Sequence, residues 1–311
     1  MFRLAHISDV HLGPLPDISY RELASKRVVG YVNWQRNRRK FMHDGVTGAI
    51  ITDITGHHVD HIAVTGDLVN LALDVEVELA KLWLEALGSG EHVSVVPGNH
   101  DAYVPGAFDK ACRAWRAYMC SDGYHGSLSR ETFPYLRVRG DVALIGVTSA
   151  RATAPFMANG FFRAGQGERL AHILDDAGKR GLFRVVMIHH PPVRDAVPQH
   201  KRLFGIGRFQ RVIRRHGAEL VLHGHSHLPS LFRIAGPSGP VPVVGVAATG
   251  QSPGGSKPAA QWNLLEIGGA PGNWALRLTR RGYTGLSIPP SALAVSDLIG
   301  DGRAFLQEEP V

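Results

Sequence analysis

The chain has 311 residues and a formal net charge of +7, with 44% hydrophobic and 20% charged residues. This composition is typical of a globular protein with a buried core, and it excludes a chain that is disordered over most of its length. The positive charge favours a polyanionic partner (a phosphate compound, a nucleic acid or an anionic membrane surface) without choosing among them.

Targeting segments, membrane spans and a disulfide framework are not expected. The stretch from Phe2 to Ser8 is too short and polar for a signal peptide, and no apolar run reaches the length of a bilayer span. Only two cysteines occur, Cys112 and Cys120, which is too few for a disulfide framework. We therefore expect packed thiols in a soluble protein of the reducing cytoplasm, with at most a peripheral contact at the inner membrane surface.

Short apolar runs alternate with longer amphipathic stretches along the chain, which predicts an α/β protein. The expected strands are 3–8, 61–65, 92–96, 142–147, 184–188, 219–222, 231–234, 241–246, 262–267 and 274–278. The expected helices are 38–55, 73–87, 106–119, 166–177 and 205–216. Strands dominate the second half, which favours a mixed or antiparallel sheet there. We expect one domain over residues 1–285 and a C-terminal tail over residues 286–311.

Residues suited to metal binding directly follow five of these strands. The five motifs are Asp9-Val10-His11, Gly66-Asp67-Leu68-Val69-Asn70, Gly98-Asn99-His100-Asp101, His189-His190-Pro191-Pro192 and Gly224-His225-Ser226-His227. Because the carboxyl ends of strands in an open α/β sheet face one crevice, five loops can bring these side chains together. Any one aspartate could simply shape a turn. Five such motifs, each at a strand end, predict a metal site.

In the same order, these motifs resemble the signature blocks of the calcineurin-like metallophosphoesterase superfamily, over residues 4–227. The resemblance implies a four-layer α-β-β-α sandwich, two mixed sheets flanked by helices, as in other metallo-dependent phosphatases. It implies a first metal ion held by Asp9, His11, Asp67 and His227. It implies a second metal ion held by Asp67, Asn99, His189 and His225, with Asp67 bridging.

This ligand set combines two carboxylates, one amide oxygen and four imidazoles. Mixed nitrogen and oxygen ligands suit Mn, Fe, Zn or Co better than Mg or Ca, and we expect Mn²⁺ to serve in vitro. Two such ions can lower the pKa of a bridging water to give a hydroxide and can clamp phosphate oxygens during in-line attack. The sequence therefore predicts a hydrolase of phosphoric ester or anhydride bonds.

Four residues beside the expected ligands are candidates for other roles. The resemblance places His100 on the leaving-group side, where it can protonate the departing oxygen. We expect Asp101 to orient His100, and a purely structural pair is the alternative. His190 and Asn70 are expected to line the substrate pocket.

A basic insertion lies at about residues 15–40, between the first two motifs. Its residues 21–40 mix arginine and lysine with Tyr31 and Trp34, a composition that fits the headgroup region of a membrane. The stretch from Ser25 to Trp34 resembles an insertion in metallophosphoesterases that cleave the pyrophosphate of UDP-2,3-diacylglucosamine. A basic helix that packs its aromatic face on the sandwich is an equal alternative. A second basic run, 201–215, either flanks the pocket or forms a solvated helix face.

Hydrolysis of a phosphodiester or pyrophosphate, in a small-molecule or lipid-linked substrate, is the leading hypothesis. The block His189-His190-Pro191-Pro192 resembles that of cyclic-nucleotide and glycerophosphodiester enzymes, which keeps this alternative open. A nuclease is a weaker alternative, because no added nucleic-acid-binding motif occurs. A non-catalytic binding module is also weaker, because every expected ligand is present. The sequence does not assign an oligomeric state.

Overall fold

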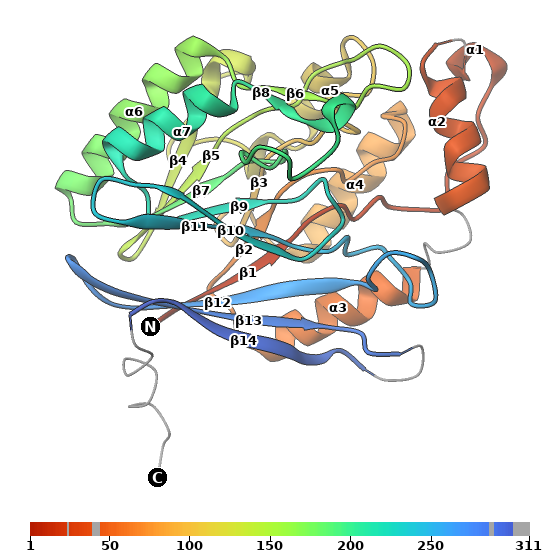
Figure 1. Ribbon diagram of the computed structural model, residues 1–311. Helices are drawn as coiled ribbons and strands as arrows, with labels where there is room; N and C mark the ends of the chain where they lie inside the picture. Colours follow the sequence, from red (N-terminus) through yellow and green to blue (C-terminus); the bar gives the residue numbers. More distant parts are fainter. Residues whose placement is uncertain (24, 39–43, 286–288, 301–311) are drawn as a thin grey trace.

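The computed structural model describes residues 1–23, 25–38, 44–285 and 289–300. Two six-stranded sheets pack against each other, and helices cover their outer sides (Figure 1). The layers therefore follow the order helix, sheet, sheet, helix. This architecture confirms the four-layer sandwich that the sequence predicts.

The first sheet combines a parallel half and an antiparallel half, in the order β14-β13-β12-β1-β2-β3. Its strands are β1 (Phe2–Ile7), β2 (His61–Val64), β3 (Val93–Val95), β12 (Gln261–Ala270), β13 (Asn273–Gly282) and β14 (Ser291–Ile299). β1, β2 and β3 pair in parallel, whereas β12 pairs with β1 in antiparallel register. The parallel half needs crossover connections, which contain α3 (Asp44–Gly56) and α4 (Asp74–Leu87).

The second sheet has the order β10-β11-β9-β7-β5-β4. Its strands are β4 (Tyr135–Arg139), β5 (Val142–Gly146), β7 (Phe183–Met187), β9 (Leu220–His223), β10 (Ser230–Ala235) and β11 (Pro240–Gly245). Further elements are α5 (Ala107–Ala114), α6 (Ala164–Lys179), α7 (Ile206–His216) and the short strands β6 (Gly160–Phe161) and β8 (Leu203–Phe204). Together, α6 and α7 cover the outer face of this sheet (Figure 1).

The central strands of the second sheet are buried on both faces, as β7 shows. Val185 and Met187 belong to the large core between the two sheets, whereas Val186 packs in the cluster under α6 and α7. A strand covered on both faces reads as a continuous apolar run. The packing of the sheets therefore fixes where β7 and β9 end relative to β1, β2 and β3.

Two expected elements differ in the structure, and part of a third lies outside the described residues. The tail expected over 286–311 contains β14, which pairs with β13 in antiparallel register. This strand lies at the sheet edge and most of its residues are not buried, so it lacks the apolar face that predicts a strand. The helix expected over 106–119 ends at Ala114 and continues as a 3-10 turn. Residues 39–43 of the expected helix 38–55 lie outside the described residues.

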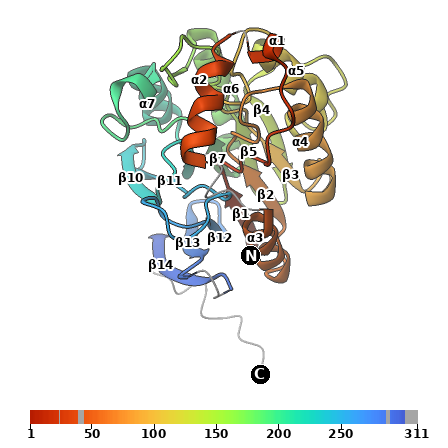
Figure 2. The ribbon, with the colours of Figure 1, turned by 90° about the vertical axis from the view of Figure 1, so that its right-hand side faces the viewer.

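The basic insertion forms two short helices at one end of the molecule. They are α1 (Tyr20–Leu23) and α2 (Arg27–Asn33), and a π-helical turn from Trp34 to Arg38 follows. Figure 2 looks onto this end and shows α2 standing in front of the two sheets. Among the described residues, no helix is long and apolar enough to cross a bilayer.

Asp53 ties α3 to the antiparallel half of the first sheet. Its carboxylate accepts hydrogen bonds from the Trp262 indole at 2.7 Å and from the Arg281 guanidinium at 2.9 and 3.0 Å. Asp53→Ala should lower the free energy of unfolding by about 2–3 kcal/mol, because it leaves a mostly buried guanidinium unpaired. Urea denaturation measures this loss.

Asp176→Ala is the matched control for this measurement. The Asp176 carboxylate lies 3.6 Å from the guanidinium of Arg180, the residue that directly follows α6, and both side chains are exposed. Such pairs contribute about 0.5 kcal/mol or less. Equal effects of the two substitutions would contradict the role given to Asp53.

Candidate active site

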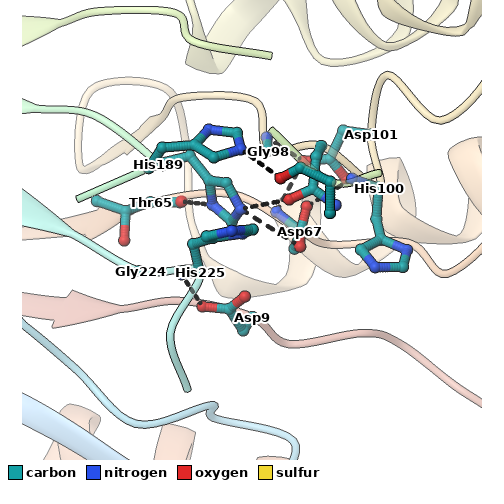
Figure 3. Close-up of polar contacts among 12 residues, drawn as sticks. Asp9, Thr65, Asp67, Gly98, His100, Asp101, His189, Gly224 and His225 are labelled. Carbon is teal, nitrogen blue, oxygen red and sulfur yellow. Dashed lines mark hydrogen bonds and ion pairs between the residues drawn. The ribbon is translucent and has the colours of Figure 1, made fainter. Parts of the chain in front are cut away.

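Five loops bring the motifs of the sequence to one place at the boundary between the two sheets. The loops after β1, β2 and β3 leave the first sheet, and those after β7 and β9 leave the second. Figure 3 shows Asp9, Asp67, His189 and His225 around a common centre. The seven residues expected to bind metal are all at most 7% exposed.

The donor atoms of these residues face one another at short range. His189 Nε2 lies 3.4 Å from Asp67 Oδ2 and 3.2 Å from Asn99 Oδ1. On the other side, His227 Nε2 lies 3.2 Å from Asp9 Oδ1, and His11 Nε2 lies 3.9 Å from both carboxylates. Two ligands that share a cation at about 2.0–2.1 Å lie about 3–4 Å apart. The spacing therefore fits metal coordination.

Each carboxylate uses one oxygen for a backbone amide and turns the other toward the centre. The His225 amide donates to Asp9 Oδ2 at 2.9 Å, and the His100 amide donates to Asp67 Oδ1 at 2.7 Å. Asp9 Oδ1 and Asp67 Oδ2 are then the oxygens nearest the imidazoles. The main chain thus selects which oxygen of each carboxylate can bind a metal ion.

Two glycines make these amide contacts possible. A Cβ on Gly224 would lie 2.6 Å from Asp9 Oδ2 and would collide with Ser8 Oγ. A Cβ on Gly98 would lie 2.6 Å from the Asp67 amide nitrogen and would collide with its Oδ1. The close approach of the loops therefore requires glycine at both positions.

Three histidines are oriented by backbone carbonyls. The Nδ1–H of His189 donates to Thr65 O at 2.6 Å and that of His11 to Val69 O at 3.1 Å. His225 uses Nε2–H instead, which donates to Lys201 O at 3.0 Å. Such bonds fix the tautomer and raise the basicity of the opposite ring nitrogen. Nε2 of His11 and His189 and Nδ1 of His225 are therefore the nitrogens suited to a metal ion.

Burial and mutual charge shift the pKa values of the cluster in opposite directions. Burial would raise the pKa of Asp9 and Asp67, but neighbouring histidines outweigh it and hold both well below the usual range. Burial would lower the pKa of His189, but Asp67 and then Asp9 raise it to about 9. Burial, followed by the charge of His189, lowers the pKa of His190 to about 3. The two buried carboxylates are thus ionised only because positive charge lies beside them.

Five of the seven residues have a backbone conformation that L-amino acids rarely adopt. The φ angles are positive at Asp9, His11, Asp67, His225 and His227, between 47° and 67°. Asp and His tolerate this region better than most residues, yet each instance costs free energy. Such strain clusters where the surrounding structure dictates side-chain direction, and here it turns five side chains toward one point.

The donor set fits a pair of divalent metal ions. Among the described residues, four overlapping groups of His and Asp have donor atoms within 4.8 Å of one another. Asp9 and His11 form such a group with His227, and Asp9 and Asp67 form another with His189. Asp9, His11, Asp67 and His189 each occur in two of the four groups. The assignment of ligands to individual ions stays a prediction.

Asp101 has different partners from those expected. Its carboxylate accepts hydrogen bonds from the amides of Gly98, Asp67, Leu68 and Val69, at 2.7, 2.8, 2.9 and 3.3 Å. Burial and then the charge of Asp67 raise its pKa to about 7. We correct its expected role: Asp101 holds the loops after β2 and β3 together, and the Asn70 carbonyl orients His100.

His100 stands at the edge of the cluster. Its Nδ1–H donates to Asn70 O at 2.5 Å, which leaves Nε2 as the nitrogen that can exchange a proton with a substrate. Its ring stacks on Tyr103, with the centroids 5.3 Å apart and the planes at 14°, and meets His11 edge-on at 4.8 Å. This position fits the acid expected at residue 100.

His190 and Asn70, the expected pocket residues, are bound to protein groups. His190 is fully buried, and its ring nitrogens pair with Ser149 Oγ at 2.7 Å and Ala158 O at 3.1 Å. Asn70 is 1% exposed, and its side-chain amide donates to Leu12 O at 2.9 Å. Both side chains thus support the loops around the site, and their role in substrate binding stays a prediction.

A cleft of about 810 Å³ opens over the cluster, and the basic insertion forms one wall of it. Asp67, Asn99, His100, His225 and His227 line its floor. Its walls include Lys26, Val29, Val32, Arg36, Phe156, Met157, Lys201 and Lys257. The second basic run is thus divided: Lys201 faces the cleft, whereas the α7 arginines at 211, 214 and 215 are exposed. Sequence patterns gave no signal for Phe156 or Lys257.

A four-layer sandwich whose strand ends converge on buried Asp and His residues defines a metal-dependent phosphoesterase. The purple acid phosphatase PPD1 from yellow lupin (Lupinus luteus) seeds has a similar structure, with a TM-score of 0.58 and 15% identity over 98% of this chain. A dimetal phosphatase from Danio rerio has a TM-score of 0.53 and 13% identity over 95% of this chain and 99% of its own. This chain spans only 55% of the lupin chain.

The family follows from the sequence itself. Residues 2–229 match the model of the calcineurin-like phosphoesterases. The chain therefore belongs to the calcineurin-like phosphoesterase family, a family of hydrolases with binuclear metal centres. No curated protein sequence matches it significantly.

Gly224→Ala should empty the metal centre. The added Cβ displaces the Asp9 carboxylate, so bound metal should fall below half of the wild-type content and hydrolysis by at least about 10²-fold. Elemental analysis of the purified protein measures metal per chain. Gly48→Ala in α3 is the control, because its Cβ meets nothing within 4 Å. Full metal content in Gly224→Ala would contradict the proposed geometry.

Asp101→Asn should weaken metal binding and the fold together. The amide group would face backbone N–H donors, so the free energy of unfolding should fall by about 1–3 kcal/mol and metal affinity by about 10–100-fold. Competition with a chelating dye measures the affinity, with Asp109→Asn on the exposed side of α5 as control. Unchanged affinity with a reduced kcat would instead restore Asp101 as the group that orients His100.

Proposed function

We propose that this protein hydrolyses a phosphodiester or pyrophosphate bond in an amphiphilic substrate, with a lipid-linked nucleotide such as UDP-2,3-diacylglucosamine as the leading candidate. The observation that supports this proposal is the composition of the cleft. Its floor is the metal-binding cluster, and its walls offer both cationic and apolar side chains. A substrate with one phosphate group at the floor and an apolar portion at the mouth matches these surfaces.

Apolar groups are concentrated at the mouth of the cleft. Phe156 is 79% exposed and Val32, on α2, is 41% exposed, and both line the cleft with Val29 and Met157. Phe156 also has a φ of +64°, a conformation that costs free energy and recurs at binding sites. These side chains would cover an acyl chain or the face of a nucleobase.

Different side chains have different roles in the proposed reaction. When bound, two divalent ions supply positive charge to the phosphoryl group and lower the pKa of a water molecule. Asp9, Asp67 and their partner histidines hold the ions' positions through the backbone contacts described above. His100 donates a proton from Nε2 to the departing oxygen, and the Asn70 carbonyl fixes the ring for that transfer. Mn²⁺ is our first choice of metal, ahead of Fe, Zn and Co.

Residues of the insertion that lie outside the cleft differ in their exposure. Trp34 is 7% exposed, which supports packing of this aromatic side chain on the protein. Val28 on α2 is 47% exposed. A peripheral membrane contact of residues 21–40 and a cytoplasmic location stay predictions.

The test compares UDP-2,3-diacylglucosamine with cyclic AMP on Mn²⁺-loaded protein, with Asp67→Asn protein as the blank. We expect cleavage of the lipid nucleotide that a chelator abolishes. Preferential cleavage of cyclic AMP would overturn the substrate and favour the cyclic-nucleotide alternative. If the protein hydrolyses neither compound, nor bis(4-nitrophenyl) phosphate, the proposed hydrolytic function is overturned.

A further inference from the structure

Lys26 joins the two walls of the cleft. It precedes α2, and its Nζ donates to Thr153 Oγ1 at 2.5 Å and to Met157 O at 2.8 Å on the opposite wall. Nζ also lies 4.5 Å from the centre of the Tyr103 ring. The ammonium group is thus fixed at a defined place in the cleft.

The docking of α2 sets this position firmly. Gly30 lies so close to Tyr103 and Leu71 that a Cβ would be 2.5 Å from Leu71 Cδ2 and would collide with the Tyr103 hydroxyl. The Arg27 guanidinium donates to Leu71 O at 3.0 Å and to Ala72 O at 2.6 Å. Because these contacts join α2 to the loop after β2, Lys26 keeps a constant relation to Asp67.

Lys26 lies on the same side of the cluster as His100. Tyr103 contacts both residues: it stacks on the His100 ring and lies under the Lys26 ammonium. Both residues line the cleft. A group bound between them would be the part of the substrate that leaves when His100 donates its proton.

The charge of Lys26 has no acidic partner in the part of the chain that the structure describes. Its hydrogen-bond acceptors, Thr153 Oγ1 and Met157 O, are neutral. Burial lowers its pKa to about 8, and Asp67 acts in the opposite direction. A partly desolvated cation whose directly bonded acceptors are all neutral is unfavourable, and a bound anion compensates it.

We propose that Lys26 binds a second phosphate, on the leaving-group side of the scissile bond, and that the substrate class is therefore a pyrophosphate diester. This inference rests on the proposed hydrolytic function. A simple diester with an alcohol leaving group offers no anion at this position. Lys26 is then a specificity-determining residue that no sequence motif of the metal centre includes.

In the proposed reaction, water cleaves the P–O–P linkage of the pyrophosphate diester. The oxygen of water bonds to one phosphorus, and the bond from this phosphorus to the bridging oxygen breaks. The bridging oxygen leaves with the electron pair on the second phosphate, next to Lys26. One proton of the water remains on the first phosphate, and His100 delivers the equivalent of the other to the leaving oxygen. Two phosphate monoesters result, and Lys26 compensates the charge that develops on one of them.

The test measures binding rather than turnover. Calorimetry on Mn²⁺-loaded protein, freed of excess metal, gives dissociation constants for methylenediphosphonate, an uncleavable pyrophosphate analogue, and for methylphosphonate, which carries one phosphonate. Lys26→Met and Lys26→Gln should each weaken methylenediphosphonate about 10–100-fold, as expected for a charge-assisted hydrogen bond. Methylphosphonate should lose less than about 3-fold. Lys26→Arg should retain most of the preference.

Lys81→Met is the matched control, because Lys81 lies on α4 with its side chain 41% exposed and outside the cleft. Circular dichroism establishes that each variant is folded, and the two Lys26 variants guard against a folding defect in one. An unchanged ratio of the two affinities in both variants would overturn the second-phosphate site. Chelator-sensitive hydrolysis of bis(4-nitrophenyl) phosphate by the wild-type protein is scored separately, so loss of the proposed hydrolytic function is distinguished from loss of this site.

Discussion

Everything at the site depends on how two buried carboxylates are held. Asp9 and Asp67 each accept one backbone amide hydrogen bond, and the loops that supply those amides also carry Asn99, His225 and His227 of the cluster. The carboxylates are buried, so their charge is unfavourable without cations beside them. Metal binding therefore depends directly on how the loops are arranged. The amides fix the oxygens before an ion arrives, which reduces the reorganisation that binding requires.

The same constraint explains the position of the site between the sheets. One carboxylate accepts from a loop of the second sheet and the other from a loop of the first, so the packing of both sheets sets the distances of the cluster. Gly98 and Gly224 allow the loops to approach, and positive φ angles at the ligands aim the side chains. The large core between the sheets stabilises the strained loops.

The insertion forms one wall of the cleft over this centre. Its helix α2 is docked by Arg27 and Gly30 on the loop after β2, and it presents Lys26 and Val32 to the cleft. A cationic inner wall and an apolar mouth suit a substrate with several phosphates and an apolar portion. The metal centre is shared with other phosphoesterases of the family, whereas this wall belongs to the insertion and is where selectivity would be determined.

The sequence by itself determined the class of fold, most strands and which Asp, Asn and His residues form the buried cluster, because strand-end motifs are local and their chemistry shows in residue type. It did not determine β14, an edge strand that depends on pairing with β13, or the roles of Asp101 and His190, whose partners lie on other loops. Trp34 and Lys26 belong to one basic segment, yet one is buried and the other faces the cleft. Only the tertiary structure decided these roles, because long-range packing, and not local pattern, sets which groups a side chain meets.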